Sequence, residues 1–172
     1  PELEEFIEFD QLLPHGIVKQ SNLWVGPGGT KAPLHMDPDD NFFLQVKGSK
    51  TFYLLSPNET KYIYANSPIS QKPEFSRIQA SNIDYLKYPK AKQAKLKIVK
   101  LKEGEILYLP AYWWHEVVND IEISISINIW CDTKFFGNYQ GMKQLIPKKI
   151  KLWVASNFSK LQKTLTLIKT AA

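Results

Sequence analysis

The sequence predicts a mainly β domain, an antiparallel barrel of the jelly-roll type, followed by a helical segment. Three observations favour this class. Short runs of β-branched and aromatic residues recur between turns that contain glycine and proline, as in antiparallel sandwiches and barrels. Residues 121–130 alternate isoleucine with mostly polar residues, which is the two-residue period of a strand. The strands show no alternation with helices, the pattern that predicts a parallel sheet.

The first half of the chain predicts strands joined by glycine turns. Gly48 and Ser49 have the composition of a two-residue hairpin turn, in which glycine supplies the positive φ. Residues 26–29, Gly-Pro-Gly-Gly, predict a tight turn; a phosphate loop would need Gly-Lys-Ser/Thr and a following helix. We expect a weak helix over 3–13 and strands over 22–25, 34–37, 41–47 and 50–55.

A long irregular segment, 58–94, separates these strands from the next group. Prolines punctuate it, and loops of this length usually act as lids or binding loops. In the strand that follows, the apolar alternation slips between Ile98 and Val99, which indicates a β-bulge. The remaining strands are expected over 96–101, 106–109, 116–118 and 121–130.

The last predicted strand indicates a polar barrel interior. Its isoleucines are expected to face a core, and its other face is expected to line a barrel with a wet or ligand-filled mouth. After Gly137 the apolar period becomes that of an amphipathic helix. We expect a barrel domain over 1–134 and a helical tail over 135–172, which covers the barrel or joins two subunits of a homodimer. The apolar helical positions are Ile150, Val154, Phe158, Leu161, Leu165 and Ile168.

His35 and Asp37 carry the chemistry predicted for this barrel. Residues two apart in a strand point to the same face, so an imidazole and a carboxylate would enter one site. His115 follows an aromatic run at the start of a distant strand and is the candidate third ligand. Two histidines and one carboxylate leave coordination positions open, which suits Fe(II), although Zn or Mn could also bind. The His-x-Asp pattern alone is a weak signal, and the prediction depends on its context.

Composition indicates a folded intracellular domain. The 172 residues predict one domain with its own core. Cys131 is the single cysteine, which excludes a disulfide framework and fits a reducing compartment, the cytoplasm or the nucleus. We find no apolar stretch of membrane-spanning length and no signal peptide pattern. The chain lacks an initiator Met, and we expect it to be part of a longer protein.

Lysine supplies most of the net charge of +5. One interpretation is an anionic partner such as RNA. The other is a solvated loop and an edge strand that lysine protects from unwanted pairing. Both interpretations stay open. The densest group comprises Lys87, Lys90, Lys92, Lys95, Lys97, Lys100 and Lys102.

Two blocks of the sequence resemble the JmjC oxygenases of the cupin-like type, in particular the branch with the factor-inhibiting-HIF asparaginyl hydroxylase and the small JmjC-only hydroxylases. The resemblance covers roughly residues 1 to 132. It implies a double-stranded β-helix, the jelly-roll barrel of the cupins. The matching segments are Gly29 to Asp37, Asn41 to Lys50 and Ser56-Pro57 in the first block, and Gly104 to Pro110, Tyr112 to His115 and Ile127 to Trp130 in the second.

The resemblance implies roles for individual residues. His35, Asp37 and His115 would bind Fe(II), with 2-oxoglutarate as co-substrate and O2 as oxidant. Lys50 would pair with the distal carboxylate of 2-oxoglutarate. For the aromatic residues, core packing is an equally good explanation. The other implied positions are Asn41 and Asn128 as polar contacts of the co-substrate, Trp24 and Phe43 as walls of its site, and Trp130 as a substrate contact near the mouth.

Two features depart from the family pattern. Three residues before the first ligand histidine, the family usually has a Ser or Thr that hydrogen-bonds 2-oxoglutarate, whereas this chain has Ala32. Thr30 is two residues out of register. The family also takes a Tyr from a strand that would precede Pro1. Both departures are expected to weaken co-substrate binding more than metal binding.

The expected activity is that of an Fe(II)- and 2-oxoglutarate-dependent dioxygenase that hydroxylates a protein side chain, with demethylation less favoured. A protein or peptide is then the expected substrate, and no membrane is involved. Two alternatives stay open. The basic charge is compatible with a tRNA-base hydroxylase of the same family, and Ala32 is compatible with a metal-binding cupin module without turnover.

Overall fold

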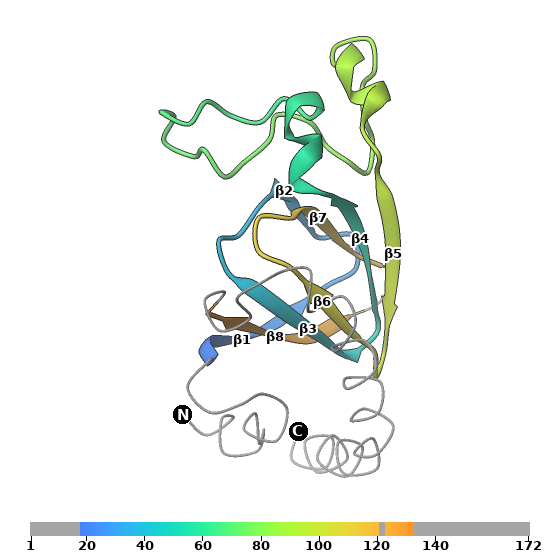
Figure 1. Cartoon of the computed structure of the whole chain (residues 1–172). Coiled ribbons are helices and arrows are strands. Elements are labelled where there is room, and N and C mark those ends of the chain that lie inside the picture. Colours follow the sequence, from blue (N-terminus) through green and yellow to red (C-terminus); the bar gives the residue numbers. More distant parts are fainter. Residues whose placement is uncertain (1–17, 121–122, 133–172) are drawn as a thin grey trace, which may run out of the picture. The chain divides into compact units, whose positions relative to one another are not determined.

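Eight strands form two four-stranded sheets in the computed structural model, which describes residues 18–120 and 123–132 (Figure 1). The strands are β1 (Val18–Gly26), β2 (Lys31–His35), β3 (Asp40–Lys47), β4 (Ser49–Leu55), β5 (Lys97–Lys102), β6 (Ile106–Leu109), β7 (Trp114–Asn119) and β8 (Ser124–Cys131). The strand orders are β1-β8-β3-β6 and β2-β7-β4-β5. The β2–β7, β3–β6, β4–β5 and β4–β7 pairs are antiparallel. The predicted mainly β, antiparallel fold is therefore confirmed.

The predicted hairpin at Gly48 is wrong in one respect. Gly48 does have a positive φ of 71°, as the turn requires, but β3 and β4 belong to different sheets. Each strand has both of its edges occupied by other strands, β8 and β6 for β3, and β7 and β5 for β4. The turn therefore carries the chain from one sheet to the other, as in a jelly roll.

The segment 58–94 is more regular than predicted. It includes most of one 3-10 helix, η2 (Pro57–Tyr62), and a second one, η3 (Pro89–Gln93). Each begins with proline, whose fixed φ and missing N–H suit a first helical position. Within the described ranges, no helix has the length and apolar character that a membrane span needs. The helices predicted over 3–13 and within 135–172 lie outside the described residues.

The β-bulge lies in β2 and not in β5, where it was predicted. Residues of β5 pair with β4 in unbroken register. The two adjacent apolar residues that suggested a bulge lie on opposite faces of a regular strand. Ile98 is an exposed apolar residue, with 63% of its surface accessible, while Val99 packs against buried apolar residues of the interior. In β2, Ala32 pairs with Val117 and His35 pairs with His115, so β2 has one extra residue between these pairs.

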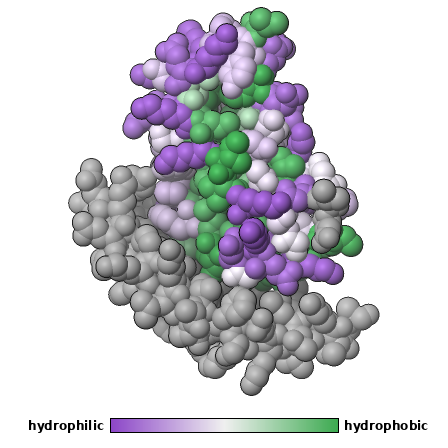
Figure 2. Space-filling model, turned by 90° about the vertical axis from the view of Figure 1, so that its right-hand side faces the viewer, coloured by the Kyte–Doolittle hydropathy of each residue, from purple (hydrophilic) through white to green (hydrophobic). Residues whose placement is uncertain are grey.

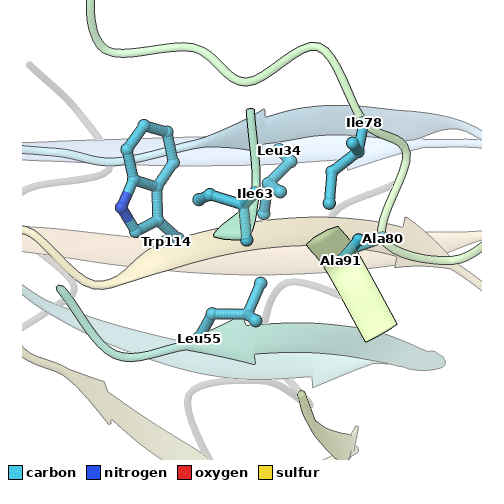
Figure 3. Close-up of a cluster of buried hydrophobic side chains, with 7 residues drawn as sticks. All are labelled: Leu34, Leu55, Ile63, Ile78, Ala80, Ala91 and Trp114. Carbon is cyan, nitrogen blue, oxygen red and sulfur yellow. The ribbon is translucent and has the colours of Figure 1, made fainter. Parts of the chain in front are cut away.

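Two hydrophobic clusters pack on opposite faces of the β2-β7-β4-β5 sheet. The adjacent residues Leu54 and Leu55 point to opposite faces, and each belongs to a different cluster. We call the cluster between the sheets the inner cluster: Phe43, Phe52, Leu54, Leu101, Leu109 and Val117. The outer cluster consists of Leu34, Leu55, Ile63, Ile78, Ala80, Ala91 and Trp114 (Figure 3).

Two buried carboxylates, one on the barrel and one within the segment, hold the segment 58–94 in place. Glu116 of β7 accepts hydrogen bonds from the backbone N–H groups of Ala80 at 2.6 Å and Ser81 at 3.1 Å. Glu59 accepts one from the N–H of Lys95 at 2.9 Å. Ionised acceptors make strong hydrogen bonds to backbone donors. Because the segment also supplies four residues of the outer cluster, it is a packed part of the fold.

The polar side chains of β8 face the interior, as predicted. Ser124, Ser126 and Asn128 are buried, and hydrogen bonds across the sheet explain how the fold accommodates two of them. Gln45 donates to Ser124 Oγ at 2.9 Å, and Asn128 donates to the side-chain oxygen of Asn41 at 3.1 Å. The isoleucines differ from prediction: Ile129 is buried, Ile125 and Ile127 are half-buried, and Ile123 is 57% exposed.

Replacing Gly48 with alanine tests the turn between the sheets. A Cβ at Gly48 would lie 2.6 Å from the carbonyl oxygen of Ile123, whereas Gly29, with φ +80°, has nothing within 4 Å. We expect Gly29→Ala to lower the free energy of unfolding by about 1–2 kcal/mol, the cost of a left-handed backbone, and Gly48→Ala to lower it further. Urea denaturation measures both. Equal losses would show that the contact with Ile123 is unimportant.

Candidate metal centre

The β-bulge in β2 places His35 opposite His115. Regular pairing after Ala32 and Val117 would put Leu34 across from His115. The extra residue reverses the alternation, so that Leu34 joins the outer cluster and His35 faces His115 with ring centroids 4.2 Å apart. Pro33 lies within the bulge, where the missing N–H of proline is tolerated.

Asp37 completes a group of three possible ligands. It lies beyond the end of β2, so the predicted strand alternation does not by itself place it. One ligand atom from each of His35, Asp37 and His115 lies within 4.8 Å of the others. The carboxylate oxygen Oδ2 of Asp37 is 3.6 Å from Nε2 of His115. The described part of the chain contains no second cluster of this kind.

Backbone carbonyls select the same tautomer in both histidines. Nδ1 of His35 lies 2.6 Å from the carbonyl oxygen of Pro33, and Nδ1 of His115 lies 3.0 Å from that of Trp113. A carbonyl oxygen only accepts, so each Nδ1 carries the proton and donates. Each Nε2 then has its lone pair free to bind a cation, which is the arrangement that orients histidine ligands in metal sites.

Burial disfavours the charged forms of His115 and Asp37. It lowers the pKa of His115 to about 3, with the nearby His35 as a smaller cause, so that His115 is neutral at pH 7. Burial also raises the pKa of the Asp37 carboxyl, an effect that His35 partly offsets. A bound cation would favour the charged form of Asp37 and remove much of this unfavourable electrostatic effect.

The connection before β7 holds the backbone of Asp37. Tyr112 has a φ of 61°, which is strained for a residue with a side chain, and its N–H donates to the carbonyl oxygen of Asp37 at 2.7 Å. Asp40, three residues after Asp37, binds the same connection. Its buried carboxylate accepts from the N–H of Ala111 at 2.9 Å and from the hydroxyl of Tyr108 at 3.0 Å. Strained residues persist where their surroundings fix them, often at functional sites.

Polar residues predicted at the co-substrate site form one connected group. Asn128 accepts from the indole N–H of Trp24 at 2.7 Å and donates to the side-chain oxygen of Asn41 at 3.1 Å. The amide nitrogen of Asn41 and the hydroxyl of Ser126 are buried without a hydrogen-bond partner in the described structure. Buried polar groups almost always have partners, so these atoms indicate an interior that receives water or a polar ligand.

Lys50 is a buried residue to which no described residue supplies a counter-charge. It lies on the same face of β4 as Phe52 and Leu54, which belong to the inner cluster. Among the described residues, none forms an ion pair or a hydrogen bond with its ammonium group. Burial lowers its pKa to about 8. Burying an unpaired charge is unfavourable, so Lys50 is a candidate for binding an anion.

The remaining predicted positions lie in three different environments. Phe43 belongs to the inner cluster and packs edge-on against Phe52, with ring centroids 5.2 Å apart. Trp24 is half-exposed on β1. Trp130 is half-buried, and its indole nitrogen has no partner among the described residues. Packing thus explains Phe43, while Trp24 contributes mainly its hydrogen bond to Asn128.

Thr30 does not replace the hydroxyl that Ala32 lacks. Its hydroxyl donates to the carbonyl oxygen of Pro27 at 2.9 Å and accepts from the side-chain amide of Asn119 at 2.6 Å. Ala32 itself packs against the inner cluster. The sequence analysis also missed Phe75, whose ring stacks on His35 with centroids 5.5 Å apart and an interplanar angle of 21°. No local sequence pattern indicates a contact between residues so far apart in the chain.

Comparison with known proteins identifies similar sequences. Residues 2–137 match the family model described as a cupin-like domain. HSPB1-associated protein 1 of Bos taurus is 33% identical over 116 residues, 66% of this chain and 24% of that protein. Lysine-specific demethylase 8 of Danio rerio is 37% identical over 109 residues, 63% of this chain and 26% of that protein. Lysine-specific demethylase JMJ30 of Arabidopsis thaliana is 36% identical over 118 residues, which are 67% of this chain and 26% of that protein. The chain thus spans about a quarter of the length of these relatives.

The stability of the metal-free protein should fall in acid because of His115. Between pH 6.5 and about 3 the unfolded chain binds a proton at this residue and the folded chain does not. The free energy of unfolding then decreases as the pH falls, by at most about 1.4 kcal/mol per pH unit. Asp37 acts in the opposite direction just above pH 3.8, because its folded pKa is raised.

Urea denaturation in a chelator, across this pH range, measures the effect. His115→Gln removes the titrating group, so the variant should have a flatter profile than the unmodified protein. Parallel profiles would show that His115 takes up a proton in the folded state, contrary to its burial.

Removing the charge of Lys50 should stabilise the ligand-free protein. Its pKa falls from 10.5 to about 8 on folding, so Lys50→Met should raise the free energy of unfolding at pH 7 by about 1–2 kcal/mol, less than the whole shift because solvent screens part of the charge. The unmodified protein should also gain stability from pH 8 to 10.5, because there the unfolded chain holds a proton that the folded chain has released. Thermal and urea denaturation test both statements. A loss of stability in Lys50→Met would show that Lys50 has an internal partner.

Proposed function

The chain belongs to the cupin-like family of JmjC domains, and from this we propose that it is an Fe(II)- and 2-oxoglutarate-dependent oxygenase that hydroxylates a protein side chain. One observation carries the proposal. Two imidazole nitrogens and a carboxylate converge in an interior that also contains a buried lysine with no charged partner among the described residues. The imidazoles and the carboxylate suit a divalent metal, and the lysine suits an anion.

The donor set fits Fe(II). His35, Asp37 and His115 would hold the ion with two nitrogens and one oxygen, and three protein ligands leave positions open for a chelating co-substrate and O2. When bound, Fe(II) with 2-oxoglutarate supplies oxidative chemistry, in which O2 and the keto acid yield succinate, CO2 and a hydroxylated substrate carbon. The protein residues need only position the reactants, and we assign no general acid or base.

Lys50 would bind the distal carboxylate of 2-oxoglutarate. Leu54, which faces His115 across the strands, lies four residues after Lys50 on the same face of β4, or roughly 13 Å along the strand. A lysine side chain and a short dicarboxylate together can span such an interval. The unpartnered Asn41 amide and Ser126 hydroxyl offer further hydrogen bonds. Because Ala32 offers none, co-substrate affinity would depend strongly on Lys50.

Apolar residues would limit the amount of water around a bound co-substrate. Phe43 and Phe52 meet between the sheets, and Val117 belongs to the same inner cluster. Excluding water strengthens the attraction between the Lys50 ammonium and a carboxylate.

We propose that Trp130, whose indole nitrogen has no partner in the described structure, contacts the substrate.

A protein substrate is favoured over RNA by the state of the lysine-rich region. Lys100 forms an ion pair with Asp120 at 3.0 Å, and the ammonium of Lys97 lies 5.8 Å from the ring centroid of Trp113. These two charges thus already interact within the fold. Figure 2 shows the side of the molecule that carries β5, where hydrophilic side chains flank an apolar stripe and do not form a continuous polar surface.

Calorimetric titration of 2-oxoglutarate into the anaerobic, Fe(II)-loaded protein tests the proposal. We expect saturable binding that His35→Ala and Lys50→Met abolish. Lys47→Met, which removes an exposed lysine three residues from Lys50, is the matched control and should bind normally. Succinate release stimulated by peptides, and unaffected by RNase, would then support a protein substrate.

Two results would contradict the proposal. Metal binding without 2-oxoglutarate binding would make the domain a metal-binding module without turnover. Turnover that depends on RNA and weakens steeply with salt would support the tRNA-base hydroxylase instead.

A further inference from the structure

We propose that Phe75 is a positioning residue of the metal centre, and that the segment 58–94 belongs to the centre because it holds the ring of Phe75 against His35. This inference rests on the metal site proposed above. It concerns how one ligand is kept in place before the ion arrives.

The backbone brings Phe75 to His35 in a fixed register. The two residues form an antiparallel β-bridge. On either side of it, the N–H of Met36 donates to the carbonyl oxygen of Glu74 at 3.0 Å, and the N–H of Ser76 donates to that of Leu34 at 2.9 Å. The segment therefore pairs with the free edge of β2, and the position of Phe75 depends on main-chain hydrogen bonds.

The ring of His35 is in contact with two other rings. Phe75 stacks on it at 5.5 Å and 21°, and His115 lies 4.2 Å away on a tilt of 49°. The Nδ1 hydrogen bond to Pro33 fixes the ring edge. His115 is fully buried, whereas His35 is partly exposed. Each ring thus has one hydrogen bond, but the surrounding core also encloses His115, whereas the partly exposed His35 relies on Phe75 to limit its rotation.

The segment that carries Phe75 is itself anchored beside the other histidine ligand. Glu116, the residue after His115, accepts the N–H groups of Ala80 and Ser81. The hydroxyl of Ser76 donates to the carbonyl oxygen of Ile63 at 2.5 Å, and both Ile63 and Ile78 are in the outer cluster. A side chain that supports a ligand is useful only if its own position is fixed, and these contacts fix it.

Metal titration of the full chain tests the role of Phe75. We choose Co(II) as the probe, because its visible absorption reports both binding and ligand geometry. Phe75→Leu should weaken Co(II) binding by about 10- to 100-fold, the range for residues that orient metal ligands, and should alter the absorption spectrum. Phe75→Tyr keeps the ring and should restore both. Phe75→Met replaces the leucine variant if that variant does not fold.

Tyr88→Leu is the matched control. Tyr88 is a half-buried aromatic residue of the same segment, but its ring contacts Tyr64 and no metal ligand. The Tyr88→Leu substitution should lower thermal stability without changing the Co(II) affinity or the absorption spectrum. Equal Co(II) binding by Phe75→Leu and the unmodified protein would overturn the inference while leaving the metal site intact. Absence of Co(II) binding by the unmodified protein would overturn the metal site as well.

Discussion

The single extra residue in β2 is the constraint on which the site depends. Neighbouring strands in register alternate their side chains between two faces, and regular pairing would send Leu34 inwards and His35 outwards. The bulge at Pro33 exchanges them, so that Leu34 fills the outer cluster and His35 meets His115. The carbonyl of Pro33 also accepts from Nδ1 of His35. One local irregularity thus places His35 opposite His115, sets its tautomer and completes the core on the other face of the sheet.

The interior combines features that oppose each other energetically. The inner cluster stabilises the fold by burying apolar surface, whereas Lys50, Asn41 and Ser126 bring a charge and unpartnered polar atoms into the same space. A fold selected for stability alone would fill these positions with apolar side chains. Their presence is understandable if a ligand with a carboxylate completes the interior. Instability of the empty state and affinity for the ligand then have the same physical origin.

Sequence patterns predicted the parts of the structure that local chemistry determines. The alternation in β8 indicated a polar interior, Gly48 indicated a turn with positive φ, and His35, Asp37 and His115 were expected to lie close together, as they do. The location of the bulge was missed, because the slip at Ile98 has the same appearance as an exposed isoleucine in a regular strand. That β3 and β4 lie in different sheets depends on which strands occupy their edges, and Lys50 taken alone resembles a solvated turn lysine. Phe75 was missed because its contact joins distant segments.

The two faces of β7 connect the proposed metal centre to the rest of the fold. His115 points into the interior, while the next residue, Glu116, points to the outer face and binds the backbone of the segment 58–94. That same segment returns to β2 and places Phe75 on His35. The two histidines are therefore linked twice, directly across the strands and through a packed segment on the outside. The position of the Phe75 ring beside His35 therefore rests on main-chain hydrogen bonds, which join this outer segment to β2 on one side and to the Glu116 carboxylate on the other.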